Sequence, residues 1–402
     1  MGTAGGVTRT ISVRAQRPGP PAADALPADA HGWRAACWLG APAPGGLALP
    51  SATPAPDTLY APRGVWLDDD RLIVADTGNH RVLIWHGSPA DDHRPADVLL
   101  GQSQWDEDGA NDGGRGSRVG LHLPTGILVR DGALIVCDAW NHRLLVWQDV
   151  PTHNRPADLI LGQPNPSEVD PNRGGEPDAT SFYWPFGAGF VGTGFWIADT
   201  GNRRMLGWLD GLPNTPDQPA DVILGQPDPT AREENGGGAP DARSFRWPHA
   251  VADLDGTLLV ADAGNHRILG WVAPDTDRDA DLVIGQPDFA TATEFPYAPQ
   301  TAAALRFPYG IAVIGKQIAV ADTANNRILL WERSRSWDRA VDGVVGAADG
   351  VLAQPTFAGN GENRWDRVAR DTLCWPYGLH RSGERIAVAD SGNNRVVVWE
   401  RP

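Results

Sequence analysis

Cysteine, lysine and long apolar runs are all scarce in this sequence of 402 residues. Its three cysteines, Cys37, Cys137 and Cys374, fit neither a disulfide framework nor the spacing of a metal site. No stretch is long and apolar enough to span a membrane, and none follows the first methionine as a secretory signal would. These absences predict a cytoplasmic protein with reduced thiols and no membrane contact.

Positive charge is also in short supply. Lysine and arginine together number 34 against 50 aspartates and glutamates, the net charge is −16, and Lys316 is the only lysine. Proteins that bind nucleic acid concentrate positive charge against the phosphates. The composition therefore argues against a nucleic-acid partner and favours an acidic protein that binds other proteins.

One segment is repeated along the chain. An apolar pair, Ala-Asp or Cys-Asp, a polar turn with Asn and Arg, an apolar run and Trp first occur together at residues 74–85. Regular self-similarity of this kind is the signature of a repeat architecture. Six copies are anchored on aspartates spaced 60 to 68 residues apart: Asp76, Asp138, Asp199, Asp262, Asp322 and Asp390.

Each copy contains four short apolar stretches. The first stretch begins at a proline that follows an apolar or aromatic residue, as in Trp184-Pro185, and we call it the leading proline. The fourth ends in Leu-Gly-Gln, as at residues 96–102. Short strands separated by Gly, Pro and Asn are typical of antiparallel sheets. Four strands in each of six units predict an all-β, six-bladed β-propeller of four-stranded antiparallel blades.

The two ends of the chain complement each other. The sixth copy ends at Trp399 without a fourth strand, and a spare copy of that strand occurs at residues 35–40. An unpaired apolar strand edge is a structure that proteins avoid. We therefore expect the N-terminal strand to complete blade six and close the ring. Residues 33–402 form the propeller in this interpretation, and the Gly-, Ala- and Pro-rich residues 1–32 form a flexible arm.

The polar turns identify a family. Asn79-His80-Arg81-Val82 and Asn141-His142-Arg143-Leu144 resemble the Asn-His-Leu signature of the NHL-repeat family, and the resemblance covers residues 33–402. It implies a six-bladed propeller. The family has mixed functions, which include protein scaffolds, RNA-binding propellers, extracellular sensors and a zinc-dependent lyase that acts on peptidyl hydroxyglycines.

The polar residues of the repeat itself are expected to be structural. His80, His142 and His266 occupy equivalent positions in different blades, so they lie on a ring and do not converge on a metal. The repeat aspartates are expected to accept hydrogen bonds from the amides of their own turns. Segments with Asn-x-Gly-Gly recur in the blade-to-blade connections at residues 111–114, 172–175 and 235–238, which points to a shared structural role.

Functional residues are expected where the repeat varies. The residue after each leading proline should face the mouth of the central channel, and the six are Arg63, Thr125, Phe186, His249, Tyr309 and Tyr377. The lyase relatives place zinc-binding histidines at several such positions, but only His249 matches here. A catalytic zinc needs about three protein ligands. No metal site and no cofactor are therefore predicted.

Two interpretations of this ring stay open. Its aromatic residues can plug the channel, with Arg63 as a cap. Alternatively, the ring forms the site of a hydrolase, lyase or isomerase for a small anionic substrate. In that case Arg63 binds the anion, His249 is the base, and Tyr309 or Tyr377 donates the proton.

Trp140 breaks the repeat in blade two, because the equivalent turn residue is Gly78, Gly201, Gly264 or Gly392 in four other blades. Such departures mark functional or strained sites. We expect Trp140 to form an exposed aromatic cluster with its neighbours on the loops, unless the adjacent connection covers it. The expected cluster is Phe182, Tyr183, Phe186 and Trp105. The leading hypothesis is a non-enzymatic scaffold that docks a protein partner around blades two and three.

Overall fold

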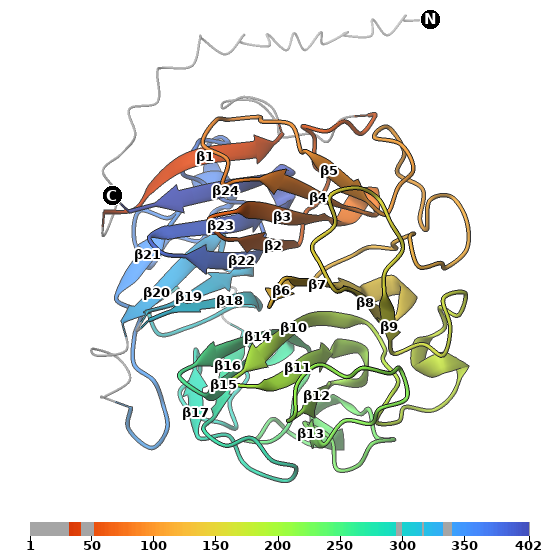
Figure 1. Ribbon diagram of the computed structural model, residues 1–402. Helices are drawn as coiled ribbons and strands as arrows, with labels where there is room; N and C mark the ends of the chain where they lie inside the picture. The colour runs from red at the N-terminus through yellow and green to blue at the C-terminus, as the bar shows by residue number, and fades with distance from the viewer. Residues whose placement is uncertain (1–31, 42–51, 295–299, 316, 333–339, 402) are drawn as a thin grey trace, which may run out of the picture.

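The computed structural model describes residues 32–41, 52–294, 300–315, 317–332 and 340–401, and it is a ring of six four-stranded antiparallel sheets (Figure 1). The prediction of an all-β, six-bladed propeller is confirmed. The only helices in these ranges are 3-10 turns of three or four residues. The expected flexible arm lies outside the described residues, apart from Gly32.

Blades one to five run from the innermost strand outward in chain order. The strands of the first three blades are β2 (Gly64–Leu67), β3 (Arg71–Asp76), β4 (Arg81–His86) and β5 (Val98–Leu100); β6 (Ile127–Arg130), β7 (Ala133–Asp138), β8 (Arg143–Trp147) and β9 (Leu159–Leu161); and β10 (Pro185–Val191), β11 (Gly194–Asp199), β12 (Arg204–Trp208) and β13 (Val222–Leu224).

Blades four and five follow the same plan, and blade six combines the two ends of the chain. Their strands are β14 (Pro248–Leu254), β15 (Thr257–Asp262), β16 (Arg267–Trp271) and β17 (Leu282–Ile284); β18 (Pro308–Ile314), β19 (Gln317–Asp322), β20 (Arg327–Glu332) and β21 (Gly350–Leu352); and β22 (Pro376–Ser382), β23 (Arg385–Asp390), β24 (Arg395–Glu400) and β1 (Arg34–Gly40).

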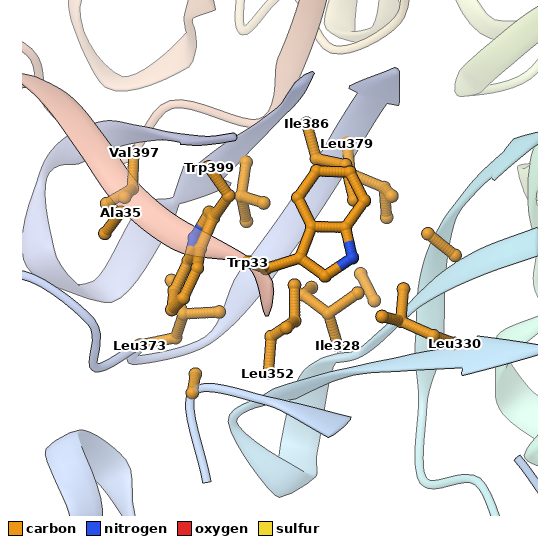
Figure 2. Packing of buried hydrophobic residues seen from close by; sticks show 14 of the residues in the cluster. Trp33, Ala35, Ile328, Leu330, Leu352, Leu373, Leu379, Ile386, Val397 and Trp399 are labelled. Atoms are coloured by element: carbon orange, nitrogen blue, oxygen red, sulfur yellow. The ribbon is translucent and has the colours of Figure 1, made fainter. Parts of the chain in front are cut away.

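The N-terminal strand closes the ring as expected. Strand β1 pairs antiparallel with β24, from Arg34 opposite Glu400 to Gly40 opposite Arg395. Just before it, Trp33 is buried between blades five and six, where Figure 2 shows it among Ile328, Leu352 and Leu379. The N-terminal segment thus supplies the outer strand of blade six and apolar surface to the interface between blades five and six.

The core is divided among the interfaces between blades. Each apolar cluster joins side chains of two neighbouring blades, such as Val82 and Ile84 of blade one with Val136 and Leu145 of blade two. The tryptophan that ends the third strand is buried in every blade, and the six are Trp85, Trp147, Trp208, Trp271, Trp331 and Trp399. Burial of large aromatic side chains stabilises such interfaces strongly, so the ring depends on contacts between adjacent repeats.

The two ends of the ring carry different loops. One end carries the turn between the second and third strand of each blade and the blade-to-blade connections, and we call it the loop face. Those turns are η2 (Thr77–Asn79), η3 (Ala139–Asn141), η5 (Thr200–Asn202), η7 (Ala263–Asn265), η8 (Thr323–Asn325) and η10 (Ser391–Asn393). The connections contain η4 (Pro171–Gly174), η6 (Glu234–Gly237) and η9 (Glu362–Trp365). The innermost strands also begin at the loop face.

Candidate functional site on the loop face

A buried ion pair holds each turn of the loop face in place. In blade one, Asp76 accepts hydrogen bonds from the side chains of Asn79 (2.8 Å) and Arg81 (2.7 Å), and from the backbone N–H of Tyr60 (2.6 Å). The other five blades repeat all three bonds. The expectation that the aspartates accept hydrogen bonds from the backbone amides of their own turns is therefore wrong. The backbone amide that donates to the aspartate lies 16 residues earlier in the chain. The carboxylate thus holds the segment just before the leading proline of its own blade.

The residue between Asn and Arg in the turn links one blade to the next. His80 accepts a hydrogen bond at Nδ1 from the backbone N–H of Leu123 (3.0 Å), and His142 does the same for Trp184 (3.1 Å). Asn394 replaces the imidazole with its side-chain oxygen, which accepts from Ala61 at 2.9 Å. His266 and Asn326 act likewise. We call these bonds interblade latches. The turn histidines thus have a structural role.

The latches require neutral imidazoles. A backbone N–H can only donate, so Nδ1 of His80, His142 and His266 must carry no proton. Burial lowers the pKa of all three to about 4, because desolvation penalises the charged form.

The residue that each latch holds has a left-handed backbone. Before the leading proline, φ is +45° at Ala61, +48° at Leu123, +61° at Trp184, +49° at Phe307 and +50° at Trp375. Large side chains rarely adopt this region unless the surroundings impose it. The exception is Trp247, which has no positive φ, and the preceding turn there carries Arg203, a side chain that cannot accept. The latches therefore fix how the aromatic side chains project onto the loop face.

The channel mouth is filled by a stack of side chains. Phe186, His249, Tyr309 and Tyr377 follow one another with ring centroids 4.3, 4.3 and 4.6 Å apart. The guanidinium of Arg63 lies 4.8 Å from the ring of Tyr377 and 5.5 Å from that of Phe186, so it completes the circle. The channel that these side chains line has a volume of about 400 Å³. Thr125, the sixth predicted member, is buried and donates to the carbonyl of Phe186 at 2.8 Å.

The chemistry of this ring suits binding better than proton transfer. His249 donates from Nδ1 to the carbonyl of Trp247 at 2.9 Å, and burial lowers its pKa to about 3. A general base works best with a pKa near the working pH, so His249 is a poor one. Burial also raises the pKa of Tyr309, which keeps its hydroxyl protonated and able to donate. Among the described residues, Arg63 has no carboxylate or hydrogen-bond partner for its guanidinium.

The aromatic cluster around Trp140 differs in membership from the prediction. Trp140 is 40% exposed, and its ring lies 4.7 Å from that of Trp184 and 6.1 Å from that of His122. Tyr183 is half-buried and stacks on Trp184 at 6.4 Å. We call Trp140, Trp184, Tyr183 and His122 the blade-two aromatic patch. Trp184 and His122 were not predicted for it, although Trp184 shares its place before a leading proline with Trp247 and Trp375.

Three predicted members lie elsewhere. Phe182 is only 1% exposed and packs between blades two and three, and the same position is apolar in every blade, so the repeat itself carried the signal. Phe186 belongs to the channel mouth. Trp105 packs against the core between blades six and one. Their inclusion with Trp140 was wrong because sequence position does not give the direction of a side chain, and these three pack into two different blade interfaces and the channel.

Blade two has room for a tryptophan in this turn because the side chain that faces the turn differs from those of blades one and three. At Gly78 an added Cβ would lie 2.5 Å from the ring of Tyr60, and at Gly201 it would lie 2.5 Å from that of Tyr183. Glycine is thus required where the side chain two residues before the leading proline folds over the turn. In blade two that side chain is His122, which leaves space for the indole.

No three His, Cys, Asp or Glu side chains within the described ranges are grouped so that they could hold a metal ion. Over the same ranges, no helix has the length and apolar character that a bilayer crossing requires.

These features define the class of the protein as a closed six-bladed β-propeller with a latched loop face. The chain contains an NHL repeat, since the family model of that name matches residues 59–85. No curated protein matches the sequence. Similar solved structures include virginiamycin B lyase from Staphylococcus aureus, which is 11% identical, with a TM-score of 0.43 over 84% of this chain and 94% of that one. Another is the WD40 propeller domain of Doa1, also 11% identical, with a TM-score of 0.42 over 91% and 97%.

Proposed function

We propose that the protein is a non-enzymatic binding propeller that docks a protein partner through its loop face around blades two and three. The observation that carries this proposal is the placement of exposed aromatic residues. In the described part of the chain, the exposed aromatic side chains are Tyr60, Trp140, Trp365 and Trp375, and all four lie on the loop face. Exposed aromatic side chains on a rigid surface are characteristic of protein interaction sites.

The blade-two aromatic patch is the proposed centre of the interface. The latch from His142 fixes the backbone of Trp184, and the ring of Trp184 supports the indole of Trp140. A side chain that is ordered before binding loses little entropy when it binds. We also propose a cytoplasmic location, which the three free cysteines support.

The test compares Trp140→Gly with Val272→Ser in the full chain purified from its source. Val272 is exposed just after β16, at the opposite end of the ring, so it controls for loss of apolar surface. We expect native mass spectrometry to show a stoichiometric protein subunit with Val272→Ser, and its loss with Trp140→Gly at an unchanged melting temperature. Equal retention of the subunit by both variants would contradict the proposal.

A second candidate is the binding of a small anion at the channel mouth, because no carboxylate of the described residues pairs with Arg63 there. Calorimetric titration with inorganic phosphate or citrate tests it. Arg63→Gln should abolish the heat of binding, whereas Arg130→Gln, at the far end of the channel, should keep it. Binding that persists in Arg63→Gln, or none to the wild-type chain, would exclude this candidate.

A further inference from the structure

The connection from blade five to blade six contains a tryptophan at a position that is glycine in three other blades. Trp365 corresponds to Gly113, Gly174 and Gly237. In each case the backbone N–H of the next residue donates to the carbonyl of the asparagine that begins the Asn-x-Gly-Gly segment or its equivalent, as Asp366 does to Asn363 at 3.1 Å. Those glycines have φ between +71° and +85°, and Trp365 has +58°. Its indole is 77% exposed. An indole that is both exposed and held in a left-handed backbone points to a function.

This connection is rigid despite its exposure. The side chains of Asn363 and Asn393 exchange hydrogen bonds of 3.0 and 2.9 Å, which fastens η9 to the turn of blade six. Arg364 donates to the carboxylate of Asp371 at 2.8 Å and to the carbonyl of Ala353 at 3.0 Å. The backbone around Trp365 is therefore fixed on both sides.

A second exposed tryptophan flanks the same short segment. The indole N–H of Trp375 donates to the carboxylate of Glu362 at 3.0 Å. The ring of Trp365 lies against Gly361, where an added Cβ would approach its Cδ1 to 2.4 Å. One indole thus lies against Gly361, and the other binds the carboxylate of Glu362, the next residue in the chain. We call Trp365, Trp375 and Glu362 the blade-six site.

Blades four and five show what is missing from this site. In blade four, Arg246 lies 5.0 Å over the ring of Trp247 and 3.3 Å from the carboxylate of Glu234. In blade five, Arg306 precedes Phe307 and pairs with Glu294 at 2.6 Å. Both blades combine glutamate, arginine and the aromatic residue before the leading proline.

Blade six keeps the glutamate and the aromatic residue but lacks the arginine. Glu362 is equivalent to Glu234, and Trp375 is equivalent to Trp247, but the position of Arg246 is taken by Cys374. No described arginine forms an ion pair with Glu362 or a cation–π contact with Trp375. By residue type, the blade-six site therefore keeps the glutamate and the tryptophan of blade four, without an arginine from the same position.

We propose that the blade-six site binds an arginine side chain of a protein partner, which supplies the guanidinium that blades four and five carry themselves. Arginine combines a planar cation that stacks on indoles with donors that match a carboxylate. The chain's net charge of −16 also favours a cationic partner segment. This surface shares no residue with the blade-two aromatic patch, so either proposal can fail without the other.

The test uses arginine–glycine repeat peptides and the ¹⁵N-labelled full chain. The indole N–H resonances of Trp365 and Trp375 are assigned with Trp365→Gly and Trp375→Phe. We expect the arginine peptide to shift both resonances, and the matched peptides with citrulline or lysine in place of arginine to shift them little. Citrulline keeps the shape and removes the charge, and lysine keeps the charge and removes the planar donor fork.

Two variants make the result specific to the site. Cys374→Arg restores the arrangement of blade four, so it should fill the site and abolish the shifts while the protein stays folded. Glu362→Gln should weaken binding about tenfold, the loss expected for a charge-assisted hydrogen bond. Equal shifts with citrulline or lysine, shifts that persist in Cys374→Arg, or no shifts at millimolar arginine peptide would each overturn the proposal.

Discussion

Trp33 provides the most direct test of how the ring is closed. Its side chain is 1% exposed and lies between blades five and six, against Ile328, Leu352 and Leu379 (Figure 2). Truncation of a buried tryptophan to alanine removes its transfer free energy and leaves a cavity, which together cost about 3–5 kcal/mol. Stacking of two arginine guanidinium groups on the ring, at 5.2 and 5.3 Å, adds to that loss.

The expected result for Trp33→Ala is a folded protein with a free energy of unfolding lower by about 4 kcal/mol. Denaturation by urea, followed by far-ultraviolet circular dichroism, measures the change. Trp365→Ala is the matched control, because it removes the same side chain from an exposed position and should cost about 0.5 kcal/mol or less. A loss below about 1 kcal/mol in Trp33→Ala would contradict the inference that this residue stabilises the interface between blades five and six.

Deletion of residues 1–41 is the stronger form of the same perturbation. It removes Trp33 together with all of β1, and it leaves the outer edge of β24 unpaired. Because an open apolar edge also invites aggregation, we expect loss of cooperative unfolding. A deletion variant that retained the melting temperature of the full chain would contradict closure by β1.

Two further predictions concern the turns of the loop face. The pKa of His142 is about 4 in the folded protein and about 6.5 in an unfolded chain, so protons favour unfolding between these values, and stability should fall as the pH drops from 7 to 4. Denaturation midpoints across this range should show the fall, and His142→Asn, which copies the asparagine latches of other blades, should lessen it. Asp262→Ala should cost about 3–5 kcal/mol, because it leaves the buried guanidinium of Arg267 without its charge partner. A cost within 1 kcal/mol in chemical denaturation would show that the pair contributes little.

Much of the fold could be predicted because a propeller repeat encodes its structure locally. The aspartate, the turn and the third-strand tryptophan recur in register, so the number of blades and strands followed from spacing. The closing strand followed as well, since residues 35–40 repeat a strand that the sixth copy lacks. The site was harder. Phe182 and Tyr183 are adjacent in sequence, yet one is in the core and the other on the loop face.

The repeat pattern is enough to specify the architecture, whereas contacts within the folded ring set which polar and aromatic residues act together. One of the three donors to Asp76 is a backbone amide 16 residues away, and the latch of His142 crosses to the next blade, so neither bond could be deduced from one turn. The latches impose left-handed backbones that turn Trp184 and Trp375 onto the loop face. Periodicity reports which residues are equivalent, whereas their directions and neighbours depend on contacts between blades that only the closed ring creates.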